Sequence, residues 1–270
     1  MAAASLQNAL APLLADPSGA AVLLDVDGTL APIVRHADDA HVPEPTRRPL
    51  ITIARHYGFV ACVSGRRAAT ARRIVSIGSI TYLGNHGSEL LPGGASDVTV
   101  DADVAAWTAR VRAFAATELA RGEVGRTRVR GEDKEAIAAF HWRGAPDEAA
   151  AEAVVDAIAA RATAAGFVLH RGRKVLEVRP PVAMDKGRGV QRLLTGRGLR
   201  VALYAGDDRT DCDAFAGLRR LVAAGELDHA VCVGVRSDET PPEIEREADL
   251  LVDGPGGVRE LLSLLAAGAG

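Results

Sequence analysis

The sequence predicts an α/β fold in which a core with a parallel sheet is interrupted by a smaller inserted α/β module. Three observations lead to this prediction. Apolar runs of strand length alternate with helical stretches, several of these runs end in polar clusters, and the alternation breaks off near residue 92 and resumes near residue 182. With 270 residues, 48% of them hydrophobic, the chain is long enough for a core domain that carries an insertion.

The first part of the core, residues 1–92, begins with an amphipathic helix over residues 1–15. Residues 20–26 form an apolar run that ends in a polar cluster, which is typical of a buried parallel strand. The alternation then continues, and we expect helices at 46–57 and 67–75 and strands at 59–63 and 80–83.

The insertion, residues 93–181, contains two long Ala-rich stretches with helical periodicity and carries no chemistry of its own. We interpret it as a cap built from two strand-helix-strand blocks and closed by Pro180 and Pro181. The expected elements are helices at 104–120 and 147–165 and strands at 98–100, 135–142, 167–170 and 174–178.

The second part of the core, residues 182–270, returns to the first pattern, so the two parts form one discontinuous domain. We expect a helix at 186–195, a strand at 201–205 followed by a short helix, a surface connection at 219–228, a strand at 230–235 and a final strand-helix unit from residue 250.

Composition and charge exclude several classes of function. Acidic and basic residues nearly balance, to a net charge of −3, which leaves no electrostatic footprint for nucleic acid or an anionic membrane. The start lacks the basic and apolar regions of a signal peptide, and no apolar run reaches the roughly 20 residues needed to cross a bilayer. We therefore expect a cytoplasmic protein and, from the balanced charge and the lack of a long exposed apolar segment, a monomer.

The three cysteines, Cys62, Cys212 and Cys232, are scattered and lack CxxC spacing. This argues against a disulfide framework or a zinc site. Cys62 and Cys232 lie inside apolar runs and are expected to be small buried hydrophobic residues, whereas Cys212 lies beside acidic residues.

Asp25 and Asp27 follow the first predicted strand in the run Leu-Asp-Val-Asp-Gly-Thr-Leu. They fall at the edge of a parallel sheet where ligands bind, and Gly28 permits a close turn there. One carboxylate can face a substrate while the second reaches the same space, and the pair suits Mg²⁺. The alternative is a strand-ending turn stabilised by Asx hydrogen bonds.

Two further elements are suited to binding phosphate. Ser64, Gly65 and Arg66 follow the second strand, where a hydroxyl and backbone N–H groups can hold a phosphate oxygen at a helix start. An ordinary Ser N-cap is the alternative. Lys186 opens a predicted helix, where its charge is unfavourable to the helix dipole but could neutralise a phosphate and a nucleophile.

A fourth element, the second acidic one, follows the strand at 201–205, where Asp207, Asp208 and Asp211 gather at one strand end. Several acids in one place are costly unless a cation compensates them. A solvated acidic helix start is the alternative.

With these four ordered motifs the sequence resembles the haloacid dehalogenase superfamily, which implies its Rossmann-like core with an inserted cap. The resemblance implies that Asp25 attacks phosphorus and that Asp27 protonates the leaving alkoxide and then activates water, with Ser64 and Lys186 as the catalytic residues of the second and third motifs. It also implies a magnesium ion held by Asp25, the Asp27 backbone carbonyl and Asp207, with Asp208 and Asp211 in support.

Within that superfamily the chain resembles trehalose-6-phosphate phosphatases over nearly its whole length, including Gly84-Asn85-His86-Gly87-Ser88-Glu89 and Lys174-Val175-Leu176-Glu177. The resemblance implies that substrate-binding residues are Gly65, Arg66, His86, Lys134, His141, Arg143, Lys174 and Glu177. His86 could instead be a structural turn residue, and the charged cap residues could face water. One departure is Cys212, where the family usually has Glu.

The leading functional hypothesis is hydrolysis of trehalose 6-phosphate to trehalose and phosphate, with a functional link to a trehalose-6-phosphate synthase. Phosphatases of other sugar phosphates, such as sucrose phosphate or mannosylglycerate phosphate, and a hexose phosphomutase remain alternatives on the same fold. A sugar-phosphate-binding module without catalysis is disfavoured, because Asp25, Asp27, Lys186 and Asp207 are all present.

Overall fold

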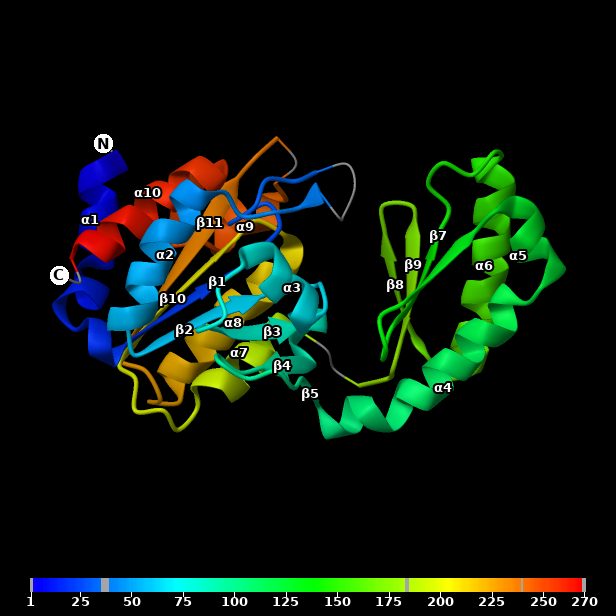
Figure 1. Cartoon of the computed structure of the whole chain (residues 1–270), viewed down its shortest axis with the longest axis horizontal. Coiled ribbons are helices and arrows are strands. Elements are labelled where there is room, and N and C mark those ends of the chain that lie inside the picture. Colours follow the sequence, from blue (N-terminus) through cyan, green and yellow to red (C-terminus); the bar gives the residue numbers. More distant parts are fainter. Residues whose placement is uncertain (1, 35–38, 183–184, 239, 269–270) are drawn as a thin grey trace. The chain divides into compact units, whose positions relative to one another are not determined.

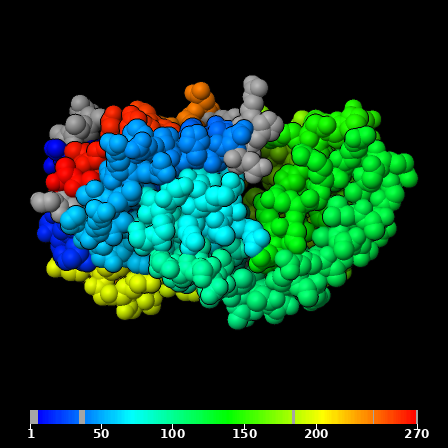
Figure 2. Space-filling model, viewed as in Figure 1, coloured from blue at the N-terminus to red at the C-terminus, as the bar shows by residue number. Residues whose placement is uncertain are grey.

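The computed structural model describes residues 2–34, 39–182, 185–238 and 240–268, and the chain divides into two compact units. Residues 1–99 with 184–270 form the core unit, and residues 100–183 form the cap unit (Figure 1; Figure 2 gives the space-filling view). The first division falls later than the predicted boundary at residue 92, because the strands β4 (Glu89–Leu91) and β5 (Thr99–Val100) still belong to the core sheet. The second division lies at residues 183 and 184, which are outside the described residues.

The core unit is built on a sheet of eight strands in the order β12-β11-β10-β1-β2-β3-β4-β5. The strands from β12 to β3 are parallel, and β4 is antiparallel to β3. This confirms the predicted α/β class. The remaining strands are β1 (Ala20–Leu24), β2 (Phe59–Val63), β3 (Thr81–Gly84), β10 (Val201–Gly206), β11 (His229–Arg236) and β12 (Leu250–Asp253).

Helices cover both faces of the core sheet, so its central strands are apolar on both sides. In β1, Val22 and Leu24 pack into one cluster, whereas Ala21 and Leu23 pack into the other. The first cluster includes buried residues of α1 (Ala2–Ala15), α2 (Glu44–His56), α3 (Ala68–Val75) and α10 (Gly254–Ala267). The second includes buried residues of α7 (Lys186–Leu194), α8 (Arg209–Ala223) and α9 (Pro242–Glu247).

The helix after β10 is longer than predicted. We expected a short helix and a surface connection at 219–228, but α8 continues to Ala223. The charged residues Arg219 and Arg220 suggested a loop, yet Leu218 and Leu221 at helical spacing are buried in the second cluster. The apolar periodicity therefore determines the structure here, and the prediction for 219–223 was wrong. The helix α9 was not predicted at all.

The cap unit contains an antiparallel sheet of four strands in the order β6-β7-β9-β8, packed against helices. One face of this sheet contributes Ala138, Phe140, Leu176 and Val178 to a cluster with the helices, and the opposite face carries polar residues. The elements are α4 (Ala102–Leu119), α5 (Gly122–Thr127), β6 (Arg130–Asp133), β7 (Ala138–His141), α6 (Glu148–Ala164), β8 (Val168–Gly172) and β9 (Val175–Arg179).

The cap unit also departs from its predicted topology. Each of its two hairpins follows helical structure, instead of the expected strand-helix-strand blocks, because β5 pairs in the core sheet. The strand β6 was missed, since all four of its residues are exposed and show no alternating apolar pattern. Residues 135–142 contain only the short strand β7, and Glu135 has a positive φ of 65° in the turn before it.

Cys62 and Cys232 are buried and unpaired, as predicted, and Cys212 is half-buried. Among the described residues, no helix combines the length and the hydropathy that crossing a bilayer requires.

Candidate active site

The carboxyl ends of β1, β2 and β10 meet at one edge of the core sheet. The register pairs Leu24 of β1 with Ala205 of β10, and β2 is the parallel neighbour on the other side of β1. The residues that follow these strands, Asp25, Ser64 and Asp207, therefore emerge at the same edge. The Asp25 N–H donates to the Ala205 carbonyl at 2.9 Å, which holds the first residue after β1 against the end of β10.

Lys186, the first residue of α7, places its ammonium between two buried carboxylates. Its Nζ lies 2.7 Å from Oδ1 of Asp25 and 2.6 Å from Oδ1 of Asp211. Burial by itself lowers the pKa of Lys186, but the two carboxylates raise the pKa further, so it lies above its usual value. Lys186 is thus a fixed positive charge beside Asp25.

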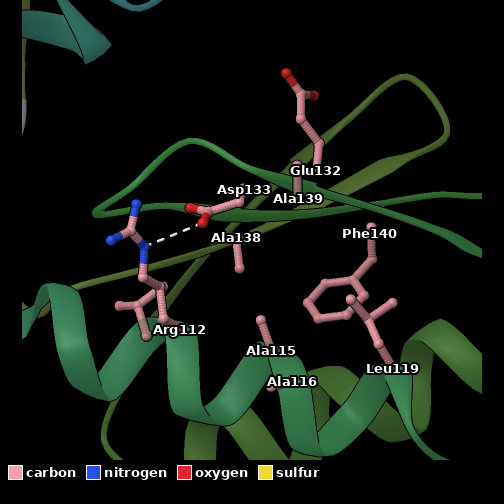
Figure 3. A pocket seen from close by; sticks show the side chains of 11 residues that line it. Arg112, Ala115, Ala116, Leu119, Glu132, Asp133, Ala138, Ala139 and Phe140 are labelled. Atoms are coloured by element: carbon pink, nitrogen blue, oxygen red, sulfur yellow. Dashed lines mark hydrogen bonds and ion pairs between the residues drawn. The ribbon is translucent and has the colours of Figure 1, made fainter.

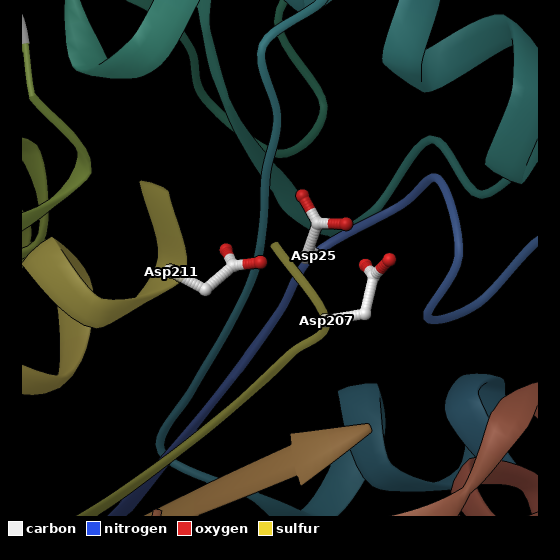
Figure 4. Close-up of side chains that lie close together, drawn as sticks. All are labelled: Asp25, Asp207 and Asp211. Atoms are coloured by element: carbon white, nitrogen blue, oxygen red, sulfur yellow. The ribbon is translucent and has the colours of Figure 1, made fainter. Parts of the chain in front are cut away.

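Asp25, Asp207 and Asp211 form a buried acidic cluster, in which one carboxylate oxygen of each lies within 4.8 Å of the others (Figure 4). Burial is the largest cause that raises the pKa of Asp207 to about 7, and Asp211 adds to it. Burial also raises the pKa of Asp25 well above its usual value, although Lys186 opposes this. When ionised, the three carboxylates and one ammonium leave two negative charges, which a divalent cation would neutralise.

The hydrogen bonds of Asp211 distinguish it from the other two acids. Its Oδ1 accepts from Lys186 and from the Tyr204 hydroxyl at 2.7 Å, and its Oδ2 accepts the Asp208 N–H at 2.9 Å. Both oxygens are engaged by protein donors, so Asp211 is the partner of Lys186, and Asp25 and Asp207 are the better placed pair to hold a cation. Sequence reasoning missed Tyr204, because it lies inside an apolar strand where an aromatic residue indicates only core packing.

Gly28 allows the loop after β1 to approach Asp207 closely. Its φ is +83°, and a Cβ at this position would stand 2.1 Å from Oδ2 of Asp207. The neighbouring Thr29 donates its hydroxyl to Oδ1 of Asp207 at 3.1 Å. The turn is closed by backbone bonds from Leu30 and Ala31 to the Val26 carbonyl. The loop after β1 is therefore shaped around Asp207, and these backbone bonds close it without the Asx bonds considered as the alternative.

Asp27 points its carboxylate toward Arg66 instead of joining the acidic cluster. Nη2 and Nε of Arg66 each lie 2.7 Å from one of the two carboxylate oxygens, in a bidentate ion pair. Both side chains are partly exposed, at 34% for Asp27 and 21% for Arg66. The pair connects the loop after β1 with the loop after β2 and leaves Asp27 accessible.

Ser64 is buried, and its hydroxyl accepts the Arg66 N–H at 3.0 Å. The N-cap of α3 is Arg67, so the alternative of a Ser64 N-cap is wrong. His86 lies against this loop, since its Cε1 is 2.8 Å from where a Cβ on Gly65 would stand. A side chain at position 65 would displace the imidazole.

Glu89 is a buried carboxylate that sequence reasoning passed over as part of a longer motif. Its Oε2 accepts the Ala68 N–H at 2.8 Å at the start of α3, and its Oε1 accepts from Asn85 Nδ2 at 2.6 Å. Asn85 and His86 have positive φ values of 45° and 54°. Glu89 therefore ties the loop after β2 to the strained turn that carries His86.

In the cap unit, the polar face of the sheet gathers several of the predicted substrate-binding residues. Lys134 Nζ lies 2.9 Å from Oε1 of Glu177, and His141 Nε2 lies 2.9 Å from Oε2 of Glu132. Burial raises the pKa of Glu177, but Lys134 and Arg179 lower it more, to about 2. This face is therefore a charged network with most of its groups already paired.

Lys174 and Arg143 do not join that network. Lys174 sits in the turn between β8 and β9 with a φ of 60°, and its ammonium pairs with Glu148 at the start of α6. Arg143 donates to the carbonyl of Arg173 at 3.2 Å. In the cap unit Lys174 is therefore directed toward α6, and the binding of substrate by Lys174 and Arg143 stays a prediction.

The remaining residues of the acidic loop serve the helix α8. Asp208 is exposed and is its N-cap, in a capping box with Asp211. Burial raises the pKa of the Cys212 thiol to about 11. Because Asp211 is held by Lys186, Tyr204 and the Asp208 N–H, its position does not depend on the residue at 212.

Comparison with known sequences assigns most of the chain to one family. Residues 23–246 match the trehalose-phosphatase family. A trehalose 6-phosphate phosphatase of Zea mays is 31% identical over 273 residues, covering 94% of this chain and 72% of the plant protein. An uncharacterized glycosyl hydrolase of Mycobacterium tuberculosis is 34% identical over 206 residues, and this chain spans 74% of its own length but 15% of that protein.

Solved structures share the fold. The C-terminal domain of trehalose-6-phosphate phosphatase from Candida albicans superposes with a TM-score of 0.74 at 22% identity, covering 99% of this chain and 98% of that one. A haloacid dehalogenase-like hydrolase from Bacteroides thetaiotaomicron superposes with a TM-score of 0.60 at 15% identity, covering 90% and 98%. This chain therefore shares its fold with a solved trehalose-6-phosphate phosphatase domain and with a solved haloacid dehalogenase-like hydrolase.

Replacing Glu89 by Gln should destabilise the core unit by about 2 kcal/mol, because one acceptor of a buried N–H becomes a donor. Glu226→Gln is the matched control, since Glu226 accepts a single backbone N–H, that of Gly196, at an exposed site. Urea unfolding should place the control within about 0.5 kcal/mol of the unmodified protein. Equal stability of the two variants would contradict the role given to Glu89.

Binding of a divalent cation such as Mg²⁺ at the acidic cluster should tighten as the pH rises through about 7. Because the pKa of Asp207 is about 7 without a cation, binding below that pH must displace a proton. Calorimetric titration should give up to about tenfold tighter binding per pH unit below pH 7, with proton release seen in two buffers of different ionisation enthalpy. An affinity that stays constant between about pH 6 and pH 8 would contradict this assignment.

Proposed function

We propose, given that this chain belongs to the trehalose-phosphatase family, that it hydrolyses trehalose 6-phosphate to trehalose and inorganic phosphate. The observation that carries the proposal is the Asp25–Lys186–Asp211 arrangement beside Asp207 at the carboxyl end of the core sheet. It combines a carboxylate that can act as a nucleophile, a fixed ammonium beside it, and a further carboxylate, that of Asp207, which can help to hold a cation.

Asp25 is the proposed nucleophile. Its Oδ1 is engaged by Lys186, which leaves Oδ2 to attack phosphorus and to form an aspartyl-phosphate as the sugar oxygen departs. Lys186 offsets the repulsion between the carboxylate and the phosphate dianion, and it stabilises the transferring group. Water then attacks phosphorus, which releases phosphate and restores the carboxylate.

Mg²⁺ fits the buried acids, because carboxylate oxygens are the ligands it prefers and the site has an excess of negative charge. Asp25 and Asp207, with the Asp27 backbone carbonyl, would hold the ion. When bound, it would neutralise charge on the phosphate oxygens. The pairing of Asp211 with Lys186 would keep these two groups apart from the ion and in place.

Asp27 is the proposed general acid and base. It would donate a proton to the leaving sugar oxygen and later accept one from the attacking water. Its ion pair with Arg66 holds the carboxylate at the accessible edge of the site. The Ser64 hydroxyl, whose oxygen accepts the Arg66 N–H, would donate its proton to a phosphate oxygen, and the Arg66 side chain would add a positive charge beside it.

The polar face of the cap sheet is the proposed source of sugar recognition. A phosphorylated disaccharide offers many hydroxyl groups, and Lys134, His141 and Glu177 offer donors and acceptors of both kinds. Because Lys134 already pairs with Glu177 and His141 with Glu132, sugar hydroxyls would exchange into an existing network. The Glu177 carboxylate, with its pKa near 2, would remain an acceptor at neutral pH.

Asp25→Asn should reduce the rate of phosphate release from trehalose 6-phosphate by more than about 10³-fold, because an amide cannot serve as the nucleophile. Asp228→Asn is a matched control, since Asp228 forms only an exposed pair with Arg200. Circular dichroism should find both variants folded. Full residual activity of Asp25→Asn would refute the assignment of the nucleophile.

A panel of phosphate esters tests the substrate. With Mg²⁺, kcat/KM for trehalose 6-phosphate should exceed that for glucose 6-phosphate by at least about tenfold, since only the disaccharide can use all the cap groups. Sucrose phosphate and mannosylglycerate phosphate test the related phosphatases, and an isomerisation assay tests the phosphomutase. If trehalose 6-phosphate released no more phosphate than glucose 6-phosphate, the specific proposal would fail.

A further inference from the structure

The strand β6 forms an exposed edge of the cap sheet. The sheet order β6-β7-β9-β8 leaves β6 with one neighbour, and all four of its residues, Arg130 to Asp133, are exposed. Such an edge can accept another strand. We propose that β6 pairs with β6 of a second copy of this chain around a twofold axis, which joins two cap sheets into one continuous sheet.

The backbone of β6 is poised for this pairing. The Lys134 N–H donates to the Ile137 carbonyl at 2.9 Å. These two residues continue the register in which β6 pairs with β7. In an antiparallel pair, every second residue points its backbone N–H and C=O groups toward the neighbouring strand. Counting back from Lys134, Glu132 and Arg130 therefore point these groups toward β7. The N–H and C=O groups of Gly131 therefore point to the outer edge, and around an axis at Gly131 they would bond to those of Gly131 in the second copy.

The charges of β6 select this register. A twofold axis perpendicular to the sheet leaves each side chain on the same face of the joined sheet. Residues that pair across the axis must therefore share a face, so one residue of β6 lies opposite its own copy at the axis. An axis at Arg130 or at Glu132 would place like charges directly opposite each other. An axis at Gly131 places Arg130 opposite Glu132 of the second copy, twice and with opposite charges.

The helix side of the same edge supports the contact. A cavity of about 380 Å³ lies between α4 and the strands β6 and β7, and Figure 3 shows Leu119 at one end of it and Arg112 with Asp133 at the other. Leu119 is 40% exposed, and its Cδ1 lies 2.5 Å from where a Cβ on Gly131 would stand. Pairing at Gly131 would bring the two Leu119 side chains together and cover them.

The residue before Leu119 anchors the end of α4 through ion pairs. The adjacent Glu118 is buried and pairs with Arg161 of α6 at 2.6 Å and with Arg121 at 2.9 Å. The expectation of a monomer was based on the balanced net charge and on the lack of a long exposed apolar segment. Neither of these detects an edge strand whose charges are complementary to themselves.

Charge reversal tests the pairing in the full chain. Sedimentation and light scattering should give twice the chain mass of 28.1 kDa for the unmodified protein. Arg130→Glu and Glu132→Arg should each place like charges opposite each other and weaken the dimer at least about tenfold. The double variant restores opposite charges in the same register and should recover the dimer.

Glu152→Arg, an equal charge reversal at an exposed position of α6, is the control and should leave the dimer unchanged. Hydrogen exchange supplies a local readout, because the Gly131 amide should become protected as the protein concentration rises. A protein that stays monomeric would overturn the proposal. A dimer that both single reversals leave intact would also overturn it, as would a dimer without protection at Gly131.

Discussion

The buried ammonium of Lys186 between Asp25 and Asp211 is the interaction on which the rest of the core site depends. A buried charge is costly unless it is paired, and each of these three groups is acceptable only because the others are present. Close packing of α7 on α8 makes the contact possible. A Cβ on Gly187 would stand 2.1 Å from the Asp213 carbonyl, and one on Gly217 would stand 2.6 Å from the Gly187 carbonyl.

Around this centre, loops from distant parts of the chain are fixed by a few buried polar bonds. Thr29 orients Asp207, Tyr204 orients Asp211, and Glu89 connects the loop after β2 with the turn after β3. None of these three residues needs to touch a substrate. They determine where the acidic groups of the site stand, and the proposed phosphoryl transfer would depend on such pre-organisation.

The sequence indicated the fold and the strand-end acids well, because apolar runs and the polar residues that follow them are local patterns. It could not indicate Glu89 or Tyr204, whose roles arise from hydrogen bonds to residues elsewhere in the fold. The strand β6 was not predicted from the sequence, because an exposed edge strand shows no alternation of apolar and polar residues. The sequence also did not indicate that Lys174, which the resemblance implies as a substrate-binding residue, sits in a left-handed turn and pairs with Glu148.

The close approach of Gly28 to Asp207 affects how the sequences of related proteins are interpreted. Because Asp207 occupies the space that any side chain at position 28 would need, the two motifs are sterically dependent on each other. A relative could retain every carboxylate and still lose the arrangement through one added methyl group. Position 28 is therefore a diagnostic position, and a homologue with Ala there is expected to have lost this arrangement even when its acidic motifs are intact.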